Sequence, residues 1–346
     1  MSDLSIAIVG TGANGASIGA DLIEAGLDVT FIEQWPAHVE AMRTDGLRVH
    51  VDGRVQRVRP RALHLCDVAT LREEFDIVLL VMKAYDADWA TRLIAPRLAP
   101  DGAIAVVQNG MTTGVVQAAV GAERTVGAVI EISSTMTEPG IVHRHVPPSR
   151  SWFAVDAAAP RTADVTRILQ HSGEVQPFDD IESAKWMKLV SNVSVLVPTA
   201  ALGLPMTDAI HVPGMREVML AAGQEALAVG RARGHTPLPI FGLIPEAIAD
   251  ADDLVATMLT ALYDRFTVPG ATTTVLQDWG KGRHSEVDDI NGVVVAEGQA
   301  LGIPTPVNTT IQDVGHAIEA GRLQPSPALL PLLRGEAVSL PRGAQR

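Results

Sequence analysis

The sequence predicts an α/β domain followed by an all-helical domain, and three observations support this fold class. Aliphatic runs of strand length alternate with helical patterns up to about residue 180, and β-branched strand runs largely disappear beyond it. The length of 346 residues suffices for two ordinary hydrophobic cores. We therefore expect an α/β domain over residues 1–180, a helical domain over 181–323, and a proline-rich, loosely held tail over 324–346.

Composition and charge exclude two classes of partner. Hydrophobic residues make up 47% of the chain and charged residues 19%, whereas aromatic residues contribute only 4% and offer few surfaces for base stacking. The formal charge of −13, from 27 Lys+Arg against 40 Asp+Glu, repels nucleic acid and anionic membrane surfaces. We expect neither nucleic acid nor a membrane as a main partner.

Cysteine content and the N-terminal pattern predict the compartment. Cys66 is the single cysteine and cannot form an internal disulfide. The start at Met1 lacks a basic, apolar secretory pattern, and the longest aliphatic runs, such as Ile77–Met82, have the length of strands rather than of membrane spans. We expect a cytoplasmic protein.

The first predicted strand, Ser5–Gly10, runs directly into a glycine-rich turn and then a helix over Ala16–Ala25. In this context Gly10 permits a tight turn, Gly12 lets backbone N–H groups approach a pyrophosphate, and Gly15 lets the helix pack closely on the strand. The alternative is a glycine turn without a ligand. The pattern predicts a Rossmann dinucleotide-binding domain, with these residues at the cofactor: Gly10, Thr11, Gly12, Ala13, Asn14 and Gly15.

The second predicted strand, Asp28–Ile32, ends at an acidic residue that bears on cofactor choice. Glu33 lies 23 residues after Gly10, close to the position of the acid that binds the adenosine ribose hydroxyls. A carboxylate repels a 2′-phosphate, and no basic residue follows before Arg43. We therefore expect NAD(H) to be preferred. NADP(H) stays open if Glu33 points to solvent and a basic residue from elsewhere meets the phosphate.

Two further strands end at polar side chains. Ile77–Val81 precedes Lys83, and Ala103–Val107 precedes Asn109. Because ligands bind at the carboxyl ends of such strands, Lys83 is a candidate cofactor contact, while the Asn109 amide suits a substrate carboxylate or carbonyl. The alternative for Asn109 is a simple Asn-Gly turn.

The rest of the α/β domain contains further predicted strands. Gly46–Pro60 alternates apolar and basic residues around Asp52-Gly53, which predicts a hairpin with a solvated basic face. Residues 125–156 contain three strand-like runs. His143 and His145 alternate on one of them, but no third ligand is suitably spaced, so we expect no metal site. A helix over Ala163–His171 and a strand over Glu174–Pro177 complete the domain.

The stretch Ala184–Ala201 predicts a buried helix, because apolar side chains point from it in all directions. Lys188 and Asn192 lie one turn apart on the same face. Loss of hydration favours the neutral form of a buried amine, and this suits a proton donor. The alternative is that Lys188 extends its stem to the surface, as we expect of Lys185.

Beyond this helix the pattern stays helical. Breaks occur at Gly203–Pro205 and His235–Pro239, a short helix lies within Thr272–Arg283, and a last helix covers Asn308–Ala320.

Between the last two helices, Ser285 is predicted to cap a helix that runs to about Leu301, with Asp288 at the capping-box position. Glu286 would then lie in its first turn, where the helix dipole favours an ionised carboxylate.

The motifs together resemble the ketopantoate reductase family, the 2-dehydropantoate 2-reductases and their relatives. The resemblance spans most of the chain and is carried in order by GTGANG, VMKAY, QNGM, WMKLVSN, LQDWGKGRHSEVDDING and LGIPTPVN. It implies a Rossmann domain and a helical domain. It also implies an NAD(P)-dependent oxidoreductase acting on a CH–OH group.

The resemblance assigns roles to individual residues. Lys188 would be the general acid that protonates the substrate carbonyl oxygen while NAD(P)H delivers hydride to the carbonyl carbon. Asn109 would help place substrate and nicotinamide, and Asn192 would hydrogen-bond the substrate. Glu286 would support the lysine and hydroxyl network, and Lys83 would lie on the cofactor side.

Two positions depart from the family pattern. Pantoate-forming members carry a second asparagine one turn beyond Asn192, where this chain has Leu196. Thr274 occupies the position of a serine that holds the substrate carboxylate, and this change keeps the hydroxyl. Both Leu196 and Thr274 are expected at the substrate. The lost donor predicts a 2-oxo acid with a more apolar tail than ketopantoate.

Three functions compete. The leading hypothesis is an NAD(H)-preferring reductase of a 2-oxo acid, or equally a dehydrogenase of the 2-hydroxy acid. The alternatives are an NADPH-dependent 2-dehydropantoate 2-reductase and, from another class, a non-catalytic nucleotide-binding regulator. A regulator would need none of Lys188, Asn192 and Glu286. The expected partner is a small-molecule 2-oxo or 2-hydroxy acid, and the sequence is compatible with a homodimer.

Overall fold

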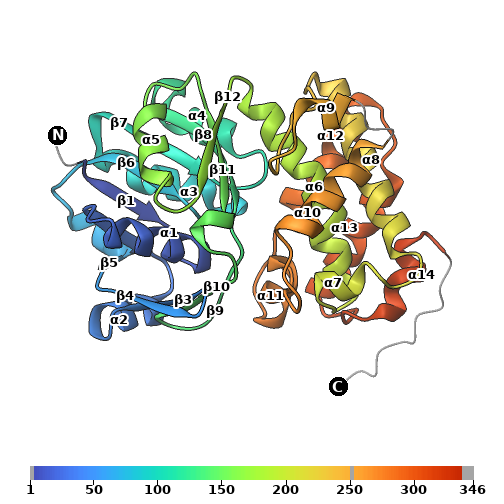
Figure 1. Cartoon of the computed structure of the whole chain (residues 1–346), viewed down its shortest axis with the longest axis horizontal. Helices are drawn as coiled ribbons and strands as arrows, with labels where there is room; N and C mark the ends of the chain where they lie inside the picture. The colour runs from blue at the N-terminus through green and yellow to red at the C-terminus, as the bar shows by residue number, and fades with distance from the viewer. Residues whose placement is uncertain (1–3, 250–252, 337–346) are drawn as a thin grey trace. The chain divides into compact units, whose positions relative to one another are not determined.

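The computed structural model describes residues 4–249 and 253–336 (Figure 1). The chain divides into two compact units, Met1–Glu182 (unit 1) and Ser183–Arg346 (unit 2). Within the described residues, no helix is both long and apolar enough to cross a membrane.

The main sheet of unit 1 has the strand order β12-β11-β8-β7-β6-β1-β2-β5. Neighbouring strands are parallel except β8 and β11, which are antiparallel. In this sheet β1 lies between β2 and β6, and the following strands are added outward on both sides. This is the doubly wound arrangement of a Rossmann domain, and it confirms the predicted fold class. The strands are Ile6–Val9 (β1), Val29–Glu33 (β2), Arg61–His64 (β5), Phe75–Leu80 (β6), Leu98–Val107 (β7), Thr125–Glu131 (β8), Trp152–Asp156 (β11) and Glu174–Phe178 (β12).

Helices cover both faces of this sheet because its central strands are apolar on both sides. Side chains from α1, α2 and α5 share one core cluster with Ile8, Phe31 and Leu79. Side chains from α3 and α4 share the other with Val9 and Val78. The helices are Ala13–Glu24 (α1), Pro36–Thr44 (α2), Ala87–Ile94 (α3), Thr113–Val120 (α4) and Thr162–Leu169 (α5).

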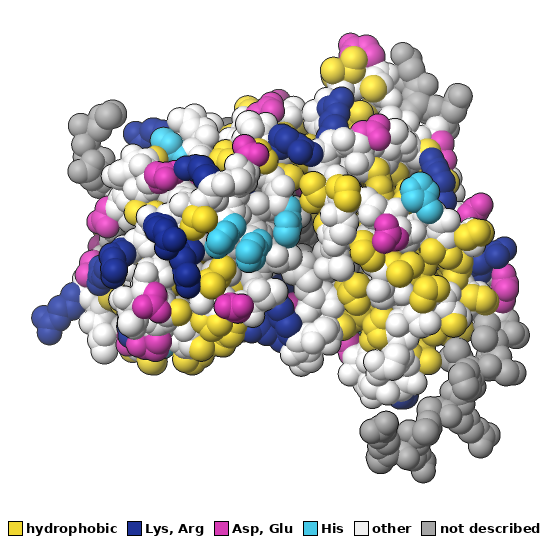
Figure 2. All heavy atoms as spheres, turned by 60° about the horizontal axis from the view of Figure 1, so that its bottom comes forward, with side chains coloured by type: hydrophobic (Ala, Val, Ile, Leu, Met, Phe, Trp, Pro, Cys, Tyr) yellow, Lys and Arg dark blue, Asp and Glu magenta, His cyan; other side chains and the backbone are white. Residues whose placement is uncertain are grey.

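A second, four-stranded sheet with the order β4-β3-β10-β9 lies in unit 1. The predicted hairpin is confirmed, since Asp52 and Gly53 have φ values of +48° and +74° at the turn. Arg54 and Arg57 of the hairpin are exposed. The face of the molecule in Figure 2 carries basic and acidic side chains mixed together. The expectation of three strands within residues 125–156 is wrong, because four are present. The strands are Leu47–Val51 (β3), Arg54–Val58 (β4), Ser134–Glu138 (β9) and Ile141–Arg144 (β10).

A buried ion pair anchors the second sheet to α1. The Arg144 guanidinium of β10 pairs with the Asp21 carboxylate of α1, and both side chains are almost fully buried. Ser172 donates to Asp21 at 2.6 Å, and Gln56 of β4 donates to its other oxygen at 3.4 Å. These bonds fix the sheet beside the helix that follows the glycine-rich turn.

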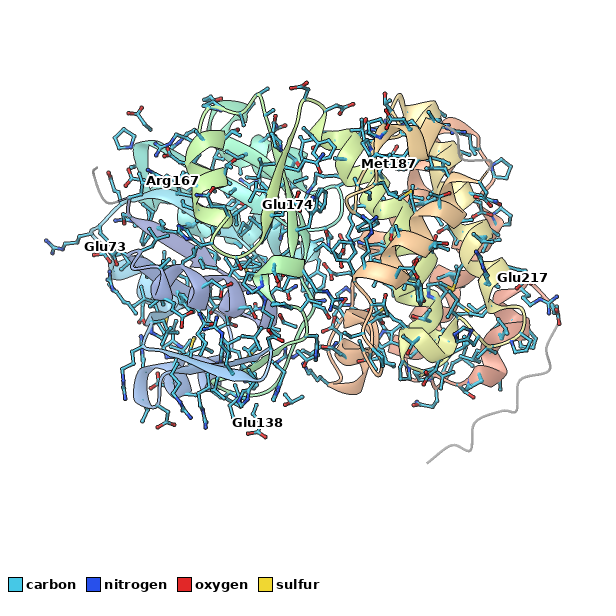
Figure 3. All side chains as sticks on the ribbon, viewed as in Figure 1. Glu73, Glu138, Arg167, Glu174, Met187 and Glu217 are labelled. Carbon is cyan, nitrogen blue, oxygen red and sulfur yellow. The ribbon has the colours of Figure 1, made fainter. Side chains whose placement is uncertain are left out.

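Unit 2 is helical, with α6 packed closely by its neighbours (Figure 1). The predicted buried helix is confirmed. Nearly all of its residues are buried, among them Met187, which Figure 3 labels. Trp186 of α6 donates to the Ala226 carbonyl of α8 at 2.9 Å. The helices are Ile181–Ala201 (α6), Met206–Ala209 (α7), Met215–Arg233 (α8), Pro245–Ala249 (α9), Leu254–Arg265 (α10), Thr274–Gly280 (α11), Val293–Leu301 (α12), Pro306–Glu319 (α13) and Leu330–Leu333 (α14).

The predicted capping box is wrong. The Ser285 hydroxyl donates to Glu319 at 2.6 Å, and the Asp288 carboxylate accepts from Gln312 at 2.7 Å, so neither side chain caps the helix. That helix opens instead with a π-helical turn over Asp288–Gly292, which leaves Glu286 before its start.

The expected loose tail is also wrong for the part that the structure describes. Ser326 N–H donates to the Ala201 carbonyl at 2.8 Å, and Leu330 and Leu333 of α14 are buried. These leucines bury apolar surface and so stabilise the segment, although its proline content led to the expectation of a loose tail. Residues 337–346 of the predicted tail lie outside the described residues.

Candidate active site

The glycine-rich turn lies where the strand order of the main sheet reverses, with β2 on one side of β1 and β6 on the other. Open α/β sheets bind ligands at such points, beyond the carboxyl ends of the strands. Gly10 adopts a φ of +90°, and a Cβ there would lie 2.4 Å from the Met82 side chain. Only glycine fits both constraints.

Gly12 and Gly15 meet different surroundings. A Cβ on Gly12, the residue before α1, would have no neighbouring atom within 4 Å, so this backbone is open to a ligand. A Cβ on Gly15 would lie 2.1 Å from the Gly10 carbonyl oxygen. The helix begins at Ala13 rather than at the predicted Ala16, and Gly15 lies in its first turn. The helix N-terminus therefore starts within the turn, as an anion-binding site requires.

Glu33 is fixed at the end of β2, with an exposed fraction of only 5%. One carboxylate oxygen accepts from the Thr11 hydroxyl at 3.1 Å, and the other accepts from the Trp35 backbone N–H at 2.9 Å. An ionised carboxylate has about four acceptor positions, so each oxygen can still accept a ribose hydroxyl.

His38 supports the same loop from α2. Gly140 N–H donates to His38 Nδ1 at 2.9 Å, which places the ring proton on Nε2, where it donates to the Thr11 carbonyl at 3.0 Å. Burial lowers the pKa of His38, and the charge of Glu33 opposes this only in part. A neutral His38 thus holds Thr11 in place, a role that the sequence did not indicate.

The turns after β6 and β7 carry Lys83 and Asn109, which are both half-buried. Gln108 links the two turns, because its side-chain amide donates to the Met82 carbonyl at 2.8 Å and the Lys83 carbonyl at 3.3 Å. Within the described residues, the side-chain oxygens of Asn14 and Asn109 are buried without a hydrogen-bond partner. Buried acceptors without a donor are costly in a folded protein, and the hydroxyl and amide groups of a dinucleotide are donors of the required kind.

In unit 2, α6 brings three of the predicted residues onto one face. Lys188 and Asn192 each have an exposed fraction of 4%, and Leu196, one turn further, is half-buried. Lys188 Nζ lies 4.8 Å from the centre of the Phe241 ring, in the geometry of a cation–π contact. The alternative that Lys188 reaches the surface is therefore wrong.

Lys185 was expected to reach solvent, and this expectation is wrong. Its exposed fraction is only 1%, so α6 is buried on the side of Lys185 as well. A buried lysine needs polar partners to offset its lost hydration.

The remaining candidates lie outside α6. Thr274 is the exposed first residue of α11, and Glu286 is half-buried just before the π-helical turn. Burial, together with the charges of Glu286 and Asp288, raises the pKa of Asp289 to about 6. Asp289 therefore takes up a proton at a higher pH than an ordinary aspartate does.

A polar network that sequence analysis missed ties the π-helical turn to α6. Asn291 donates to the Val193 carbonyl of α6 at 3.2 Å and to the Asn308 side chain at 2.8 Å. Asn308 in turn donates to Glu225 of α8 at 2.8 Å. An asparagine inside a helical pattern, before Gly292, was the available signal. The network holds α6 in place and thereby the side chains of its polar face.

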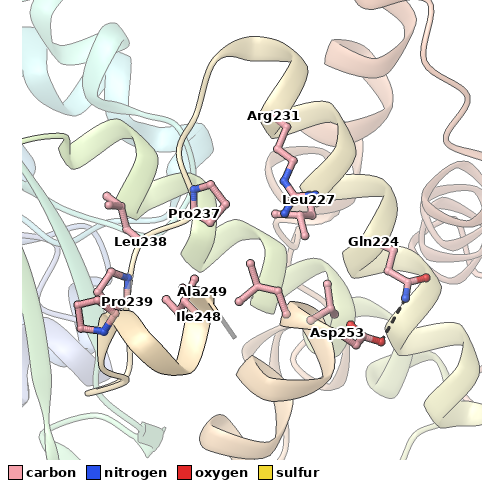
Figure 4. Close-up of a pocket in the computed structure, with 12 residues that line it drawn as sticks. Gln224, Leu227, Arg231, Pro237, Leu238, Pro239, Ile248, Ala249 and Asp253 are labelled. Atoms are coloured by element: carbon pink, nitrogen blue, oxygen red, sulfur yellow. Dashed lines mark hydrogen bonds between the residues drawn. The ribbon is translucent and has the colours of Figure 1, made fainter. Parts of the chain in front are cut away.

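Unit 2 also contains a cavity of about 820 Å³ (Figure 4). It lies between α8 and the segment around α9, with mostly apolar walls and the polar side chains of Gln224, Arg231 and Asp253. Lys188 and Asn192 do not line it, so the volume of this cavity does not indicate the size of the substrate. Among the residues that the structure describes, no cluster of three or more His, Cys, Asp or Glu could hold a metal ion.

Comparison with known proteins places the chain in a class. The family model described as Ketopantoate reductase PanE/ApbA matches residues 6–155, and the model of its C-terminal domain, Ketopantoate reductase PanE/ApbA C terminal, matches residues 180–319. The chain therefore belongs to the ketopantoate reductase family. This confirms the resemblance and the expectation of an NAD(P)-dependent oxidoreductase acting on a CH–OH group.

Individual relatives agree with this class. A 2-dehydropantoate 2-reductase of Caulobacter vibrioides is 29% identical over 315 residues, covering 89% of this chain and 96% of the relative. The crystal structure of a PanE/ApbA family ketopantoate reductase from Ralstonia eutropha JMP134 superposes with a TM-score of 0.78 at 27% identity, covering 92% of this chain and 99% of that one. D-mandelate dehydrogenase in complex with NADH and anilino(oxo)acetate shares the fold, with a TM-score of 0.81 at 18% identity and 92% and 99% coverage.

Proposed function

We propose that this protein reduces a 2-oxo acid to the 2-hydroxy acid, and catalyses the reverse, with NAD(H) preferred over NADP(H). The observation that carries the proposal is the buried Lys188 on α6, with Asn192 one turn away, in a chain of this family. Burial of a lysine is costly, and general acid catalysis gives a function to a buried amine that shares its helix face with Asn192.

The two residues of α6 act on the substrate in different ways. Lys188 donates a proton to the carbonyl oxygen as that oxygen gains negative charge, and in the reverse direction the neutral amine takes the proton back. The Asn192 amide hydrogen-bonds the substrate, and the Thr274 hydroxyl takes its carboxylate. Glu286 supports the lysine and hydroxyl network.

Unit 1 would hold the cofactor through its loop and turns. NADH, when bound, supplies the hydride for the carbonyl carbon. The backbone at Gly12 and the start of α1 bind the pyrophosphate, and Glu33 accepts from the adenosine ribose. Lys83 and Asn109 complete the set, with the unpartnered Asn109 oxygen available to the nicotinamide amide. The complex of D-mandelate dehydrogenase with NADH, a protein that shares the fold, supports this part of the proposal.

A second candidate is the NADPH-dependent 2-dehydropantoate 2-reductase, which the names of the relatives favour. A panel of 2-oxo acids, each assayed with NADH and with NADPH by the loss of reduced-cofactor absorbance, tests both candidates. The leading proposal predicts turnover of apolar 2-oxo acids with NADH. A protein that reduces ketopantoate alone and only with NADPH supports the second candidate, and one that reduces none of these acids with either cofactor contradicts both candidates.

Glu33 is expected to set the cofactor preference. Glu33→Gln keeps the shape but removes the charge that repels a 2′-phosphate, so the ratio of kcat/KM for NADPH to that for NADH should rise about tenfold, a change of ~1.4 kcal/mol. Glu33→Arg should raise it further. The matched control is Glu40→Gln, an exposed acid of α2, which should leave the ratio unchanged. A wild-type protein that already prefers NADPH tenfold or more, ~1.4 kcal/mol, contradicts this role.

Leu196 is expected to select the substrate tail. An apolar tail packs on this half-buried leucine, whereas a hydroxylated tail leaves its hydroxyl unpaired. Leu196→Asn should shift kcat/KM toward ketopantoate, relative to an analogue without the hydroxyl, by about tenfold or more. Leu196→Met, which keeps an apolar side chain, should cause no such shift. If wild-type protein already prefers ketopantoate over every such analogue by orders of magnitude, Leu196 does not have this role.

A further inference from the structure

The segment between α8 and α10 contains a backbone conformation that bulky residues rarely adopt. Phe241 has a φ of +61° and Gly242 a φ of +67°. Among the described residues other than glycine, Asp52 alone shares a positive φ with Phe241, and Asp52 lies in a hairpin turn that commonly requires one. An aromatic side chain in the left-handed region is unfavourable and persists only where other contacts enforce it.

Arg265, at the end of α10, supplies such contacts. Its Nη1 donates to the Phe241 carbonyl at 3.0 Å and to the Gly242 carbonyl at 2.9 Å. Charged donors form stronger hydrogen bonds than neutral ones, so one guanidinium fixes both residues of the turn. The turn is therefore held in a defined conformation although it lies outside regular secondary structure.

This conformation places the Phe241 ring in a specific environment. The side chain is fully buried. Its ring centre lies 5.5 Å from that of Phe266 on one side and 4.8 Å from Lys188 Nζ. Core packing accounts for a large apolar side chain at position 241, but it does not account for an aromatic ring at a backbone with a positive φ. The contact with the ammonium distinguishes phenylalanine from leucine, because the face of an aromatic ring carries partial negative charge.

We propose that Phe241 is a positioning residue for Lys188 and holds its ammonium in place on the face of α6 that also carries Asn192. An aromatic face attracts a cation without offering an oxygen that would compete with the substrate for its protons. The contact with the ring limits the rotamers open to the long side chain of Lys188. The inference rests on the proposed function, since Lys188 has to act as the proton donor for its position to matter.

Two Phe→Leu variants, at position 241 and at the neighbouring ring of position 266, test this role. Phe241→Leu removes the aromatic face at Lys188, and Phe266→Leu removes the neighbouring ring, which packs on Phe241. Phe241→Leu should lower kcat for the best 2-oxo acid by about 3- to 30-fold, the range of a cation–π contact. KM and the dissociation constant of NADH should stay within about twofold, because the Phe241 side chain is fully buried and is not proposed to bind either ligand. Phe266→Leu should leave kcat within about twofold of wild type.

A size-conserving series guards against misfolding of the leucine variant. Phenylalanine with progressively more ring fluorines at position 241 keeps the shape but weakens the negative face of the ring. We expect kcat to fall stepwise along this series. A kcat that stays within about twofold of wild type, or that rises, for both Phe241→Leu and the most fluorinated ring overturns the proposal.

A spectroscopic measurement separates this proposal from the proposed function. The chain contains only Lys83, Lys185, Lys188 and Lys281, so ¹³C-labelled lysine gives few NMR signals. The ring current of Phe241 should shift the Lys188 ε-CH₂ protons upfield, and Phe241→Leu should abolish that shift while Phe266→Leu keeps it. A Lys188 signal that is the same in Phe241→Leu and wild type overturns the positioning role, whether or not the enzyme turns over. Failure of the wild type to reduce any 2-oxo acid overturns the proposed function instead.

Discussion

Lys188→Ala is expected to lower kcat by ~10²–10⁴-fold while the dissociation constant of NADH stays nearly unchanged. Hydride addition to a ketone places negative charge on oxygen, and the loss of a positioned acid leaves that charge to water. In the proposed function the loop from Gly10 to Gly15, in unit 1, holds the cofactor, so the NADH affinity should not depend on a side chain of α6. Steady-state kinetics and a fluorescence titration with NADH measure the two quantities.

Two controls distinguish lost chemistry from lost structure. Lys188→Met keeps most of the side-chain volume in the buried helix and should lose as much kcat as Lys188→Ala. Lys188→Arg keeps the positive charge but should not restore activity, because a guanidinium stays protonated and is a poor acid near neutral pH. A folded Lys188→Met protein that binds NADH and retains more than about a third of the wild-type kcat excludes Lys188 as the proton donor.

Gly15→Ala is expected to damage both the stability of unit 1 and the binding of NADH. The added Cβ would lie 2.1 Å from the Gly10 carbonyl oxygen, and a backbone atom cannot move aside as a flexible side chain can. Overpacking of this kind typically lowers the free energy of unfolding by about 1–3 kcal/mol. Because α1 has to move away from β1, the loop between them changes conformation. The NADH affinity of the protein should therefore fall at least about tenfold. Urea denaturation and NADH titration measure the two effects.

Gly12→Ala is the matched variant for this prediction. Its Cβ would meet no atom within 4 Å, so the free energy of unfolding should change by no more than about 0.5 kcal/mol. The methyl group would nevertheless stand where the pyrophosphate approaches the backbone, and NADH affinity should fall. If Gly12→Ala binds NADH as tightly as wild type, the loop is a structural turn without a ligand.

The sequence was most informative where local pattern and burial agree. The central strands of unit 1 are continuous aliphatic runs, and the glycine spacing after β1 has one well-known structural use. The helix α6 was predictable because apolar residues occur on all sides of it over many turns. The same pattern singled out Lys188, since a charged residue on such a helix requires an explanation.

Other features depend on contacts between residues distant in sequence. Strands β9 and β10 form because β10 pairs with β3, about ninety residues away, and no local signal specifies that register. Ser285 matched a capping pattern, but Glu319 of α13 offered its hydroxyl a stronger, charged acceptor. Phe241 gave no signal at all, because a positive φ at a phenylalanine is imposed by Arg265 and not by its own sequence.

A single-turnover experiment tests the assignment of Lys188 as proton donor most directly. Enzyme in excess over NADH is mixed rapidly with a saturating apolar 2-oxo acid, and the decay of NADH absorbance reports hydride transfer without product release. The account predicts rapid decay for wild type and a rate constant at least ~10²-fold smaller for Lys188→Met, with equal NADH binding in both proteins. Equal decay rates in the two proteins would contradict it.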